Sequence, residues 1–174
     1  MKHLYFCRHG ESEANVADVW SGTMETPLTA NGKTQAQKAG EHARNLHIDH
    51  IVCSTLGRAH NTAEIIAGEI GYPLNKIERN SLFIERHFGQ MEGASREIDT
   101  NVDGFIDVET RDTVLNRARL ALEYLLTIEA DTVLVVSHGT FGRALRHMLY
   151  PDEHTFEKTE KSPRFPNAEV MKLI

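Results

Sequence analysis

The sequence has little cysteine, no long apolar run and no excess of positive charge. Its two cysteines, Cys7 and Cys53, both lie within apolar runs, so we interpret them as small buried hydrophobes rather than as disulfide partners. No segment approaches the apolar length that spans a bilayer, and the first apolar run is too short for a signal peptide. The net charge of -6 argues against a general nucleic-acid binder. We therefore expect a cytoplasmic protein with no nucleic-acid or membrane partner.

Strand-like and helix-like segments alternate along the 174 residues of the chain. Short apolar runs predict strands at residues 4–7, 50–54, 73–77, 132–137 and 168–174. Apolar residues at helical spacing predict helices at residues 30–46, with Thr29 as the N-cap, and at residues 57–70, 112–129 and 139–149. This alternation indicates an α/β protein with a mostly parallel sheet. The length fits one domain, residues 1–174, in which the weakly patterned segment 86–111 forms a short cap-like excursion over the sheet.

Residues suited to anion chemistry follow several predicted strands. These strand ends carry Arg8 and His9, Ser54 followed by Arg58, and His138 followed by Gly139. The carboxyl ends of parallel strands share one edge of a sheet, so two histidines and two arginines are expected to meet there. A single histidine at a strand end is more often structural, and the prediction therefore depends on both His-Gly turns together. The helix that begins at Gly139 also presents backbone N–H groups that suit an anion.

A cysteine nucleophile is the competing interpretation of the same strand ends. Phosphatases of that kind place five residues between the cysteine and the arginine of one phosphate-binding loop. Only four residues separate Cys53 from Arg58, and Cys7 is followed directly by Arg8. Neither spacing closes such a loop, which favours packing roles for both cysteines.

Segments from one end of the chain to the other resemble one known family. In chain order they read RHGESEAN, PLTANGKTQAQKAG, CSTLGRAHNTAEII, ERHFGQMEG, VSHGTFGRAL and PNAEV. The tripeptide RHG alone is weakly specific, but the ordered set resembles the histidine phosphatase superfamily, the phosphoglycerate mutase-like proteins. The resemblance runs from Leu4 to the last predicted strand. It implies a three-layer α/β/α fold with a small cap, and an enzyme that acts on a small phosphorylated substrate.

The resemblance also implies a role for each matching residue. His9 would be the nucleophile that takes up the phosphoryl group, and Glu85 would be the proton donor. The phosphate pocket and the substrate site would be formed by Arg8, Arg58, His138, Asn15, Ser21, Gly22 and Gly139. Arg86 would hold a carboxylate or a second phosphate of the substrate. Glu92 lies seven residues after Glu85 and is a rival for the proton-donor role.

These implied roles are chemically coherent. A histidine must be neutral to attack phosphorus, and neighbouring arginines disfavour the imidazolium form. The same arginines stabilise the negative charge that spreads over the phosphoryl oxygens. The negative charge of a bound phosphate favours a protonated carboxyl group beside it, as a proton donor requires. The sequence has no metal-ligand spacing, and His42, His47 and His50 are expected to face solvent, so we expect neither a metal nor another cofactor.

Three functions remain open at this stage. Only 53 positions separate Glu85 from His138, and the helix 112–129 occupies 18 of the residues between them, which leaves little chain for a deep closed cap. An open, wet pocket favours hydrolysis, so a metal-independent phosphatase is the preferred prediction. Phosphoglycerate mutase-type transfer is the alternative, because ERHFG at 85–89 is close to the E-R-H-Y-G of the mutases. A non-catalytic protein that binds a phosphorylated ligand is less consistent with the intact residue set.

Overall fold

The computed structural model describes residues 1–96, 104–156 and 164–174. Five strands form one sheet in the order β3-β2-β4-β1-β5. They are β1 (His3–Arg8), β2 (His50–Cys53), β3 (Glu78–Arg79), β4 (Thr132–Ser137) and β5 (Val170–Lys172). Every neighbouring pair is parallel except β1 and β5. The predicted α/β class with a mostly parallel sheet is confirmed.

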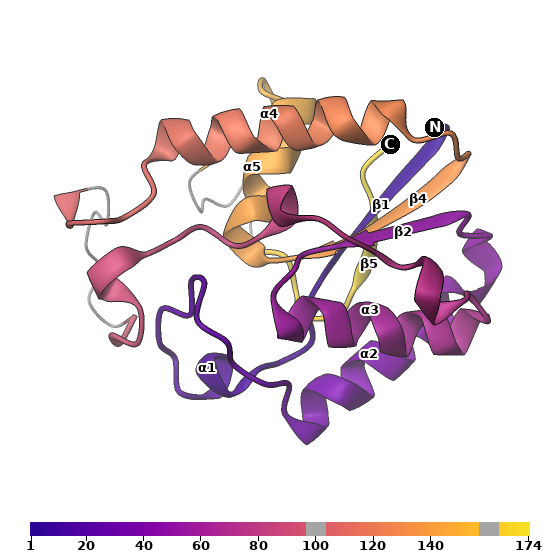
Figure 1. Ribbon diagram of the computed structural model, residues 1–174, viewed down its shortest axis with the longest axis horizontal. Coiled ribbons are helices and arrows are strands. Elements are labelled where there is room, and N and C mark those ends of the chain that lie inside the picture. Colours follow the sequence, from indigo (N-terminus) through magenta and orange to yellow (C-terminus); the bar gives the residue numbers. More distant parts are fainter. Residues whose placement is uncertain (97–103, 157–163) are drawn as a thin grey trace.

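Helices cover both faces of the sheet. They are α1 (Glu13–Val16), α2 (Ala30–Ala43), α3 (Gly57–Ile70), α4 (Arg111–Thr127) and α5 (Gly139–Leu149). Short 3₁₀ turns occur at η1 (Arg44–Leu46), η2 (Leu74–Lys76), η3 (Ser81–Phe83) and η4 (Gly89–Met91). Figure 1 shows α4 and α5 on one side of the sheet and α2 and α3 on the other, which gives the expected three layers. Thr29 caps α2 as predicted, because its hydroxyl accepts a hydrogen bond from the N–H of Gly32 at 2.9 Å.

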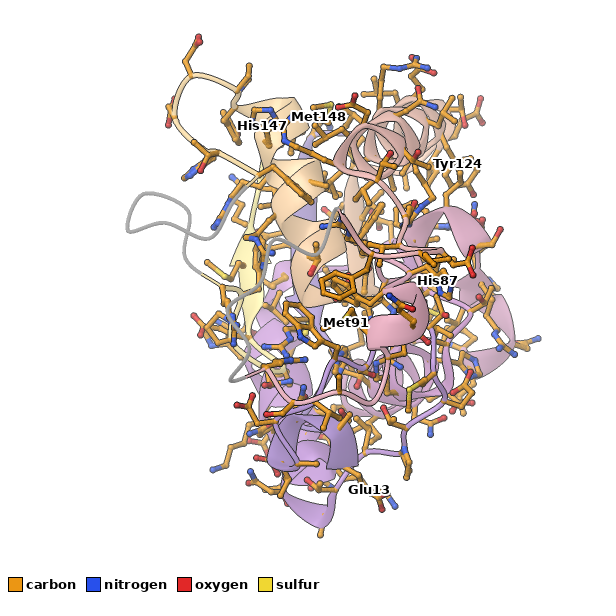
Figure 2. All side chains as sticks on the ribbon, turned by 90° about the vertical axis from the view of Figure 1, so that its left-hand side faces the viewer. Glu13, His87, Met91, Tyr124, His147 and Met148 are labelled. Carbon is orange, nitrogen blue, oxygen red and sulfur yellow. The ribbon has the colours of Figure 1, made fainter. Side chains whose placement is uncertain are left out.

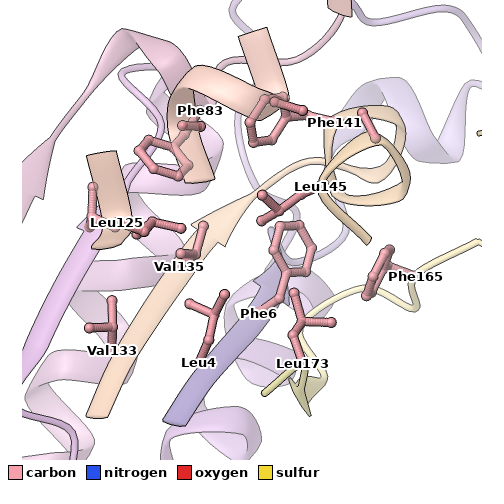
Figure 3. Close-up of a cluster of buried hydrophobic side chains, with 14 of the residues drawn as sticks. Leu4, Phe6, Phe83, Leu125, Val133, Val135, Phe141, Leu145, Phe165 and Leu173 are labelled. Atoms are coloured by element: carbon pink, nitrogen blue, oxygen red, sulfur yellow. The ribbon is translucent and has the colours of Figure 1, made fainter. Parts of the chain in front are cut away.

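The central strand β4 shows how the sequence builds these layers. All six of its side chains are buried, as expected of a strand that is covered on both faces. Val133 and Val135 pack in the cluster under α4 and α5, whereas Leu134 and Val136 pack in the cluster under α2 and α3. Figure 3 shows the first cluster, where the side chains of β1 and β4 meet those of α4 and α5. The period-2 alternation of a strand therefore divides one apolar run between two cores.

The structure differs from the strand predicted at 73–77. Residues Leu74–Lys76 form the 3₁₀ turn η2, and the strand β3 begins only at Glu78. Pro73 starts the turn, and the N–H of Lys76 donates to the carbonyl of Pro73 at 2.9 Å. The prediction was wrong because Leu74 and Ile77 are three residues apart, a spacing that fits a 3₁₀ turn and not the period-2 alternation of a strand.

The excursion predicted at 86–111 is described in part, because residues 97–103 lie outside the described residues. Its described part contributes to a third, small hydrophobic cluster. The members of this cluster are Phe88, Met91, Trp20, Ala94, Phe105 and Val108. Figure 2 looks onto this side of the molecule, which carries α1 with Glu13 and the excursion with His87 and Met91. The excursion therefore packs against the loop that follows α1, beside the carboxyl ends of the strands.

No helix formed by the described residues is both long enough and apolar enough to cross a membrane.

We predict opposite effects on stability for two helical glycines. A Cβ atom added at Gly142 in α5 would lie 2.5 Å from the ring of buried Phe6, so Gly142→Ala should lower the free energy of unfolding by about 1–3 kcal/mol. A Cβ atom at Gly68 in α3 would have no atom within 4 Å, and Gly68→Ala should raise the same free energy by about 0.5–1 kcal/mol. Urea unfolding of the two variants measures both, and equal effects would contradict the packing described here.

Candidate active site

Three strand ends meet at one edge of the sheet, as the sequence predicts. The N–H of His9 donates to the carbonyl of Ser137, and the N–H of Ser54 donates to the carbonyl of Val136, which extends both ladders beyond the strands. The rings of His9 and His138 lie 5.2 Å apart, centroid to centroid. A cavity of about 200 Å³ opens beside them.

Eight of the ten predicted site residues line this cavity. They are Arg8, His9, Asn15, Ser21, Gly22, Arg58, Glu85 and Gly139. His138 is fully buried behind His9 and does not line the cavity. Arg86 does not line it either, because its guanidinium lies over the ring of Phe88 and its Nε–H donates to the carbonyl of Glu109 at 2.8 Å. The structure therefore brings eight of the predicted residues together around one cavity and leaves His138 and Arg86 outside its lining.

The His9 imidazole is held as a neutral base. Its Nδ1 lies 2.7 Å from the carbonyl oxygen of Gly10, and a carbonyl can only accept, so Nδ1 carries the proton. Its Nε2 accepts a hydrogen bond from the Nε–H of Arg58 at 3.3 Å. Burial, followed by the charges of Arg58 and Arg8, holds the pKa of His9 well below its usual value of 6.5. An unprotonated Nε2 beside the cavity is the atom that a phosphoryl acceptor needs.

Arg58 is fixed by the loop that follows α1. It is only 1% exposed, and its two terminal nitrogens donate to the carbonyls of Met24 at 2.8 Å and Gly22 at 2.7 Å. Gly22 has a φ of +47°, and a Cβ atom there would lie 2.0 Å from Oε1 of Glu92. A glycine is therefore required at this turn, which presents the carbonyls that orient Arg58.

Arg8 and Asn15 also line the cavity. A terminal nitrogen of Arg8 donates to the carbonyl of Phe165 at 3.1 Å, and burial lowers the pKa of Arg8 to about 10, which leaves it charged at neutral pH. The side-chain oxygen of Asn15 accepts from the N–H of Ser12 and from the amide of Asn167, each at 3.1 Å. Both bonds use the oxygen of Asn15, so its NH₂ is the group available to an anion.

Asn167 is a positioning residue that sequence reasoning did not assign. Its amide nitrogen donates to the carbonyl of His9 at 2.8 Å as well as to Asn15. The signal for it was present, because Asn167 belongs to the PNAEV segment of the family resemblance. Through these two bonds the segment before β5 is tied to the nucleophile candidate and to one of its phosphate ligands.

His138 lies next to His9 and is fully buried. Its Nε2 lies 2.8 Å from the hydroxyl oxygen of Ser54, and its buried Nδ1 has no hydrogen-bond partner among the described residues. Burial, with the charges of Arg58 and His9 next, holds the pKa of His138 well below 6.5. A buried ring nitrogen without a partner is costly, so this atom is suited to bond a ligand oxygen.

Glu85 occupies the N-terminus of α5. Its Oε1 accepts from the N–H groups of Arg86 at 2.9 Å and Phe141 at 3.0 Å, and its Oε2 accepts from Thr140 at 3.1 Å. The helix N–H groups that the sequence suggested for a bound anion are therefore engaged by this carboxylate. Oε1 thus accepts two backbone hydrogen bonds and Oε2 accepts one.

Glu92, the other candidate for proton donor, forms hydrogen bonds to the backbone of two loops. Its Oε1 accepts from the N–H groups of Thr23 at 2.8 Å and Phe88 at 3.1 Å, and it lies 2.9 Å from Nδ1 of His87. Glu92 does not line the cavity. Glu92 therefore connects the loop after α1, whose carbonyls bond Arg58, to the excursion that follows Glu85. Its effect on the site is to position that loop.

Several residues that line the cavity escaped sequence reasoning. They are Trp20, Phe88, Arg96, Thr140, Arg143 and Arg164. Arg143 could have been found, because it lies on the helix that follows His138. Arg96 and Arg164 lie in stretches without periodicity, where no local pattern gives the direction of a side chain. With them, five arginines and one glutamate line the cavity of a protein whose net charge is -6.

The cysteines have the packing roles that were predicted. Cys7 and Cys53 are both 0% exposed and belong to the hydrophobic cluster under α2 and α3. Burial raises the pKa of each thiol to about 12, which removes the thiolate that a nucleophile requires. Among the described residues, no group of three or more His, Cys, Asp and Glu side chains is arranged to hold a metal ion.

Fold and site together define an α/β protein with a histidine in an arginine-lined cavity at the edge of its sheet. Over residues 4–173 the chain matches the histidine phosphatase superfamily (branch 1), and it belongs to that superfamily. The histidine phosphatase superfamily consists of enzymes and includes both phosphatases and mutases. Among curated proteins, the chain is 37% identical to the probable phosphoglycerate mutase GpmB of Citrobacter koseri, over 80% of this chain and 70% of that protein.

Solved structures agree with this assignment. Bacillus stearothermophilus YhfR superposes with a TM-score of 0.85 at 26% identity, covering 99% of this chain and 90% of the other. A mycobacterial glucosyl-3-phosphoglycerate phosphatase in a complex with VO3 superposes with a TM-score of 0.74 at 26% identity, covering 87% and 81%.

We predict that His9 stays neutral at pH values where an ordinary histidine is protonated. Unfolded histidine takes up a proton near pH 6.5, whereas folded His9 does so only well below it. As pH falls below 6.5, His9 should therefore lower the free energy of unfolding by up to about 1.4 kcal/mol per pH unit. NMR of ¹³C-labelled histidine, assigned with His9→Gln, should show a neutral His9 ring at pH 6. Titration of His9 at or above pH 6.5 would contradict the electrostatics described here.

Proposed function

We propose that this protein is a metal-independent phosphatase that hydrolyses small phosphomonoesters through a phosphohistidine intermediate on His9. The observation that carries this proposal is the neutral His9 ring, whose Nδ1–H is engaged by Gly10 while Nε2 lies at an arginine-lined cavity. Fixed guanidinium groups supply the charge stabilisation that phosphoryl transfer requires.

In the first step, Nε2 of His9 attacks phosphorus and the bond from phosphorus to the ester oxygen breaks. Arg58 already directs its Nε–H at Nε2 of His9, and its terminal nitrogens are held by two carbonyls. A phosphate that enters the cavity takes over the Nε–H bond, which frees the lone pair of Nε2 for attack. The available donors of Arg8 and Asn15, together with Nδ1 of His138, are suited to the equatorial phosphoryl oxygens.

The leaving alkoxide takes its proton from Oε2 of Glu85. Hydrogen bonds from α5 and from Arg86 orient this carboxyl group toward the cavity that it lines. In the second step the same group, now a carboxylate, removes a proton from water. The resulting hydroxide attacks phosphorus, the bond from phosphorus to Nε2 of His9 breaks, and inorganic phosphate leaves.

Hydrolysis is preferred to transfer because little chain is available to close the site. Of the 52 residues between Glu85 and His138, 17 belong to α4, which lies on the opposite side of the sheet from α2 and α3. Water reaches a phosphohistidine in a lightly covered site more easily than in a closed one. The similarity to solved structures of proteins named as phosphatases also supports hydrolysis.

Phosphoglycerate mutase-type transfer is the second candidate. It is favoured by the names of curated relatives, several of which are called probable phosphoglycerate mutase GpmB. It is also compatible with a cavity that carries more arginines than one phosphate group uses.

We predict that a phosphoryl adduct forms on His9. The protein is mixed with a phosphomonoester and the reaction is quenched rapidly, which should trap an adduct that is labile in acid and stable in base. Peptide mass spectrometry should locate this adduct on His9. His9→Ala should abolish the adduct and lower kcat by at least about 1,000-fold, because it removes the nucleophile. An adduct on Cys7 or Cys53, or turnover retained by His9→Ala, would refute the mechanism.

The same preparation distinguishes hydrolysis from transfer. Incubation with 3-phosphoglycerate and a trace of 2,3-bisphosphoglycerate should release inorganic phosphate faster than it forms 2-phosphoglycerate. The opposite ratio would establish the mutase activity. Binding of phosphorylated ligands without an adduct would instead establish a non-catalytic binder.

We predict that the two rival carboxylates respond differently to the same substitution. Glu85→Gln keeps an oxygen acceptor for α5 but carries no proton to donate, so kcat for an alkyl phosphate should fall by about 100-fold or more. The loss should be smaller for p-nitrophenyl phosphate, whose leaving group needs less protonation.

Glu92→Gln is the matched control, because its amide oxygen can still accept from Thr23 and Phe88. It should retain kcat within about threefold for both substrates, since only loop-holding bonds change. A larger loss in Glu92→Gln than in Glu85→Gln would exchange the roles of the two residues.

A further inference from the structure

We propose that Gln35 on α2 and Thr62 on α3 are positioning residues that set the tautomer of the His9 ring. They act through the two peptide groups that flank Gly10, and neither side chain lines the cavity. This role rests on the proposed function, in which Nε2 of His9 attacks phosphorus, but the tautomer itself is measured without any turnover.

The tautomer matters because a neutral imidazole carries its proton on one ring nitrogen only. Nε2 presents a lone pair to the cavity only when the proton resides on Nδ1. The carbonyl oxygen of Gly10, 2.7 Å from Nδ1, holds the proton there. Whatever fixes the direction of this carbonyl therefore fixes the tautomer of His9.

Gln35 holds the peptide group that supplies this carbonyl. The group joins Gly10 to Glu11, and in a planar trans peptide the N–H and the C=O point in opposite directions. The N–H of Glu11 donates to Oε1 of Gln35 at 2.9 Å. A half-turn of the peptide would break this bond and would point an N–H group, in place of the carbonyl, at Nδ1 of His9. Gln35 therefore opposes the rotation that favours the other tautomer.

Thr62 holds the preceding peptide group, which joins His9 to Gly10. The Thr62 hydroxyl is fully buried and donates to the carbonyl of Arg58 at 2.7 Å. Its one proton is used in that bond, so its oxygen accepts from the N–H of Gly10, at 3.0 Å. Arg58 in turn directs its Nε–H at Nε2 of His9. Thr62 thus connects the backbone next to Nδ1 with the residue that bonds Nε2.

Gly10 depends on such external bonds because it has no side chain of its own to fix it. A Cβ atom there would lie 2.3 Å from the carbonyl oxygen of Gly32, in the first turn of α2, so only glycine fits. Glycine has the largest backbone freedom of any residue. The helices α2 and α3, which lie side by side on one face of the sheet (Figure 1), supply one restraining bond each.

The test reads the tautomer by NMR of ¹⁵N-labelled histidine, because protonated and unprotonated ring nitrogens have well-separated resonances. Assigned with His9→Gln, the wild-type ring should carry its proton on Nδ1 at pH 7. Gln35→Met removes the acceptor at nearly the same side-chain length, and Thr62→Val removes the hydroxyl at nearly the same shape. Each variant should shift both His9 resonances toward those of the opposite tautomer.

Turnover of p-nitrophenyl phosphate gives a second measurement. In Gln35→Met and Thr62→Val, kcat should fall by about tenfold, the effect of one lost orienting hydrogen bond. KM should stay within about twofold, because neither side chain lines the cavity. Gln35→Glu and Thr62→Ser keep an oxygen for the same N–H groups, and they should restore the wild-type resonances.

Two residues of α2 provide matched controls. The side chain of Gln37 is exposed on the same helix as Gln35. The hydroxyl of Thr34 donates to the carbonyl of Ala30, four residues earlier, at 3.2 Å, as that of Thr62 does to Arg58. Gln37→Met and Thr34→Val should therefore change neither the His9 resonances nor kcat.

Each outcome has one meaning. Wild-type resonances in both Gln35→Met and Thr62→Val would overturn the positioning role, and so would equal shifts in the two controls or a wild-type ring protonated on Nε2. If Thr62→Val does not fold, Gln35→Met decides, because Gln35 is only partly buried. Shifted resonances in a protein without turnover would leave the positioning role standing and refute the phosphatase proposal.

Discussion

The contact between Arg58 and His9 is the constraint on which the rest of the site depends. A guanidinium that is almost fully buried must satisfy its N–H groups, and it does so with two loop carbonyls and Nε2 of His9. This arrangement joins the end of β1, the start of α3 and the loop after α1. Burial keeps the imidazole neutral, and Arg58 adds to this effect because a second cation beside its guanidinium is unfavourable. The turn at Gly22 and the carboxylate of Glu92 are needed mainly to present those carbonyls.

A second theme is the separation of charge within an acidic protein. The chain as a whole carries a net charge of -6, yet the cavity at the sheet edge gathers five arginines around one glutamate. Glu85 is stable there because the N-terminus of α5 donates two N–H bonds to it. The carboxylate thus lies where an anion is favoured, in the lining of the cavity. A local field of this kind attracts anions whatever the net charge of the molecule.

The fold and much of the site could be predicted from the sequence for a simple physical reason. A buried parallel strand needs a continuous apolar run such as TVLVVS, and the carboxyl ends of such strands must share an edge. His9, Arg58 and His138 follow directly from this rule. The predictions that were wrong concern segments in which the local sequence pattern is weak. PLNKI formed a turn rather than a strand, and Arg86, which lies next to Glu85, turned away from the cavity to bond the carbonyl of Glu109.

By itself, the sequence determined the layers, the order of the family motifs and the superfamily, because each depends on patterns among neighbouring residues. Only the tertiary structure decided which nitrogen of His9 faces the cavity and which of two nearby carboxylates lines it. It alone also showed that Arg96 and Arg164 join the site. The direction of those side chains is set by contacts between residues far apart in the chain, such as the bridge from Val19 to Ser95. Contacts of that range leave no periodic signal in the sequence.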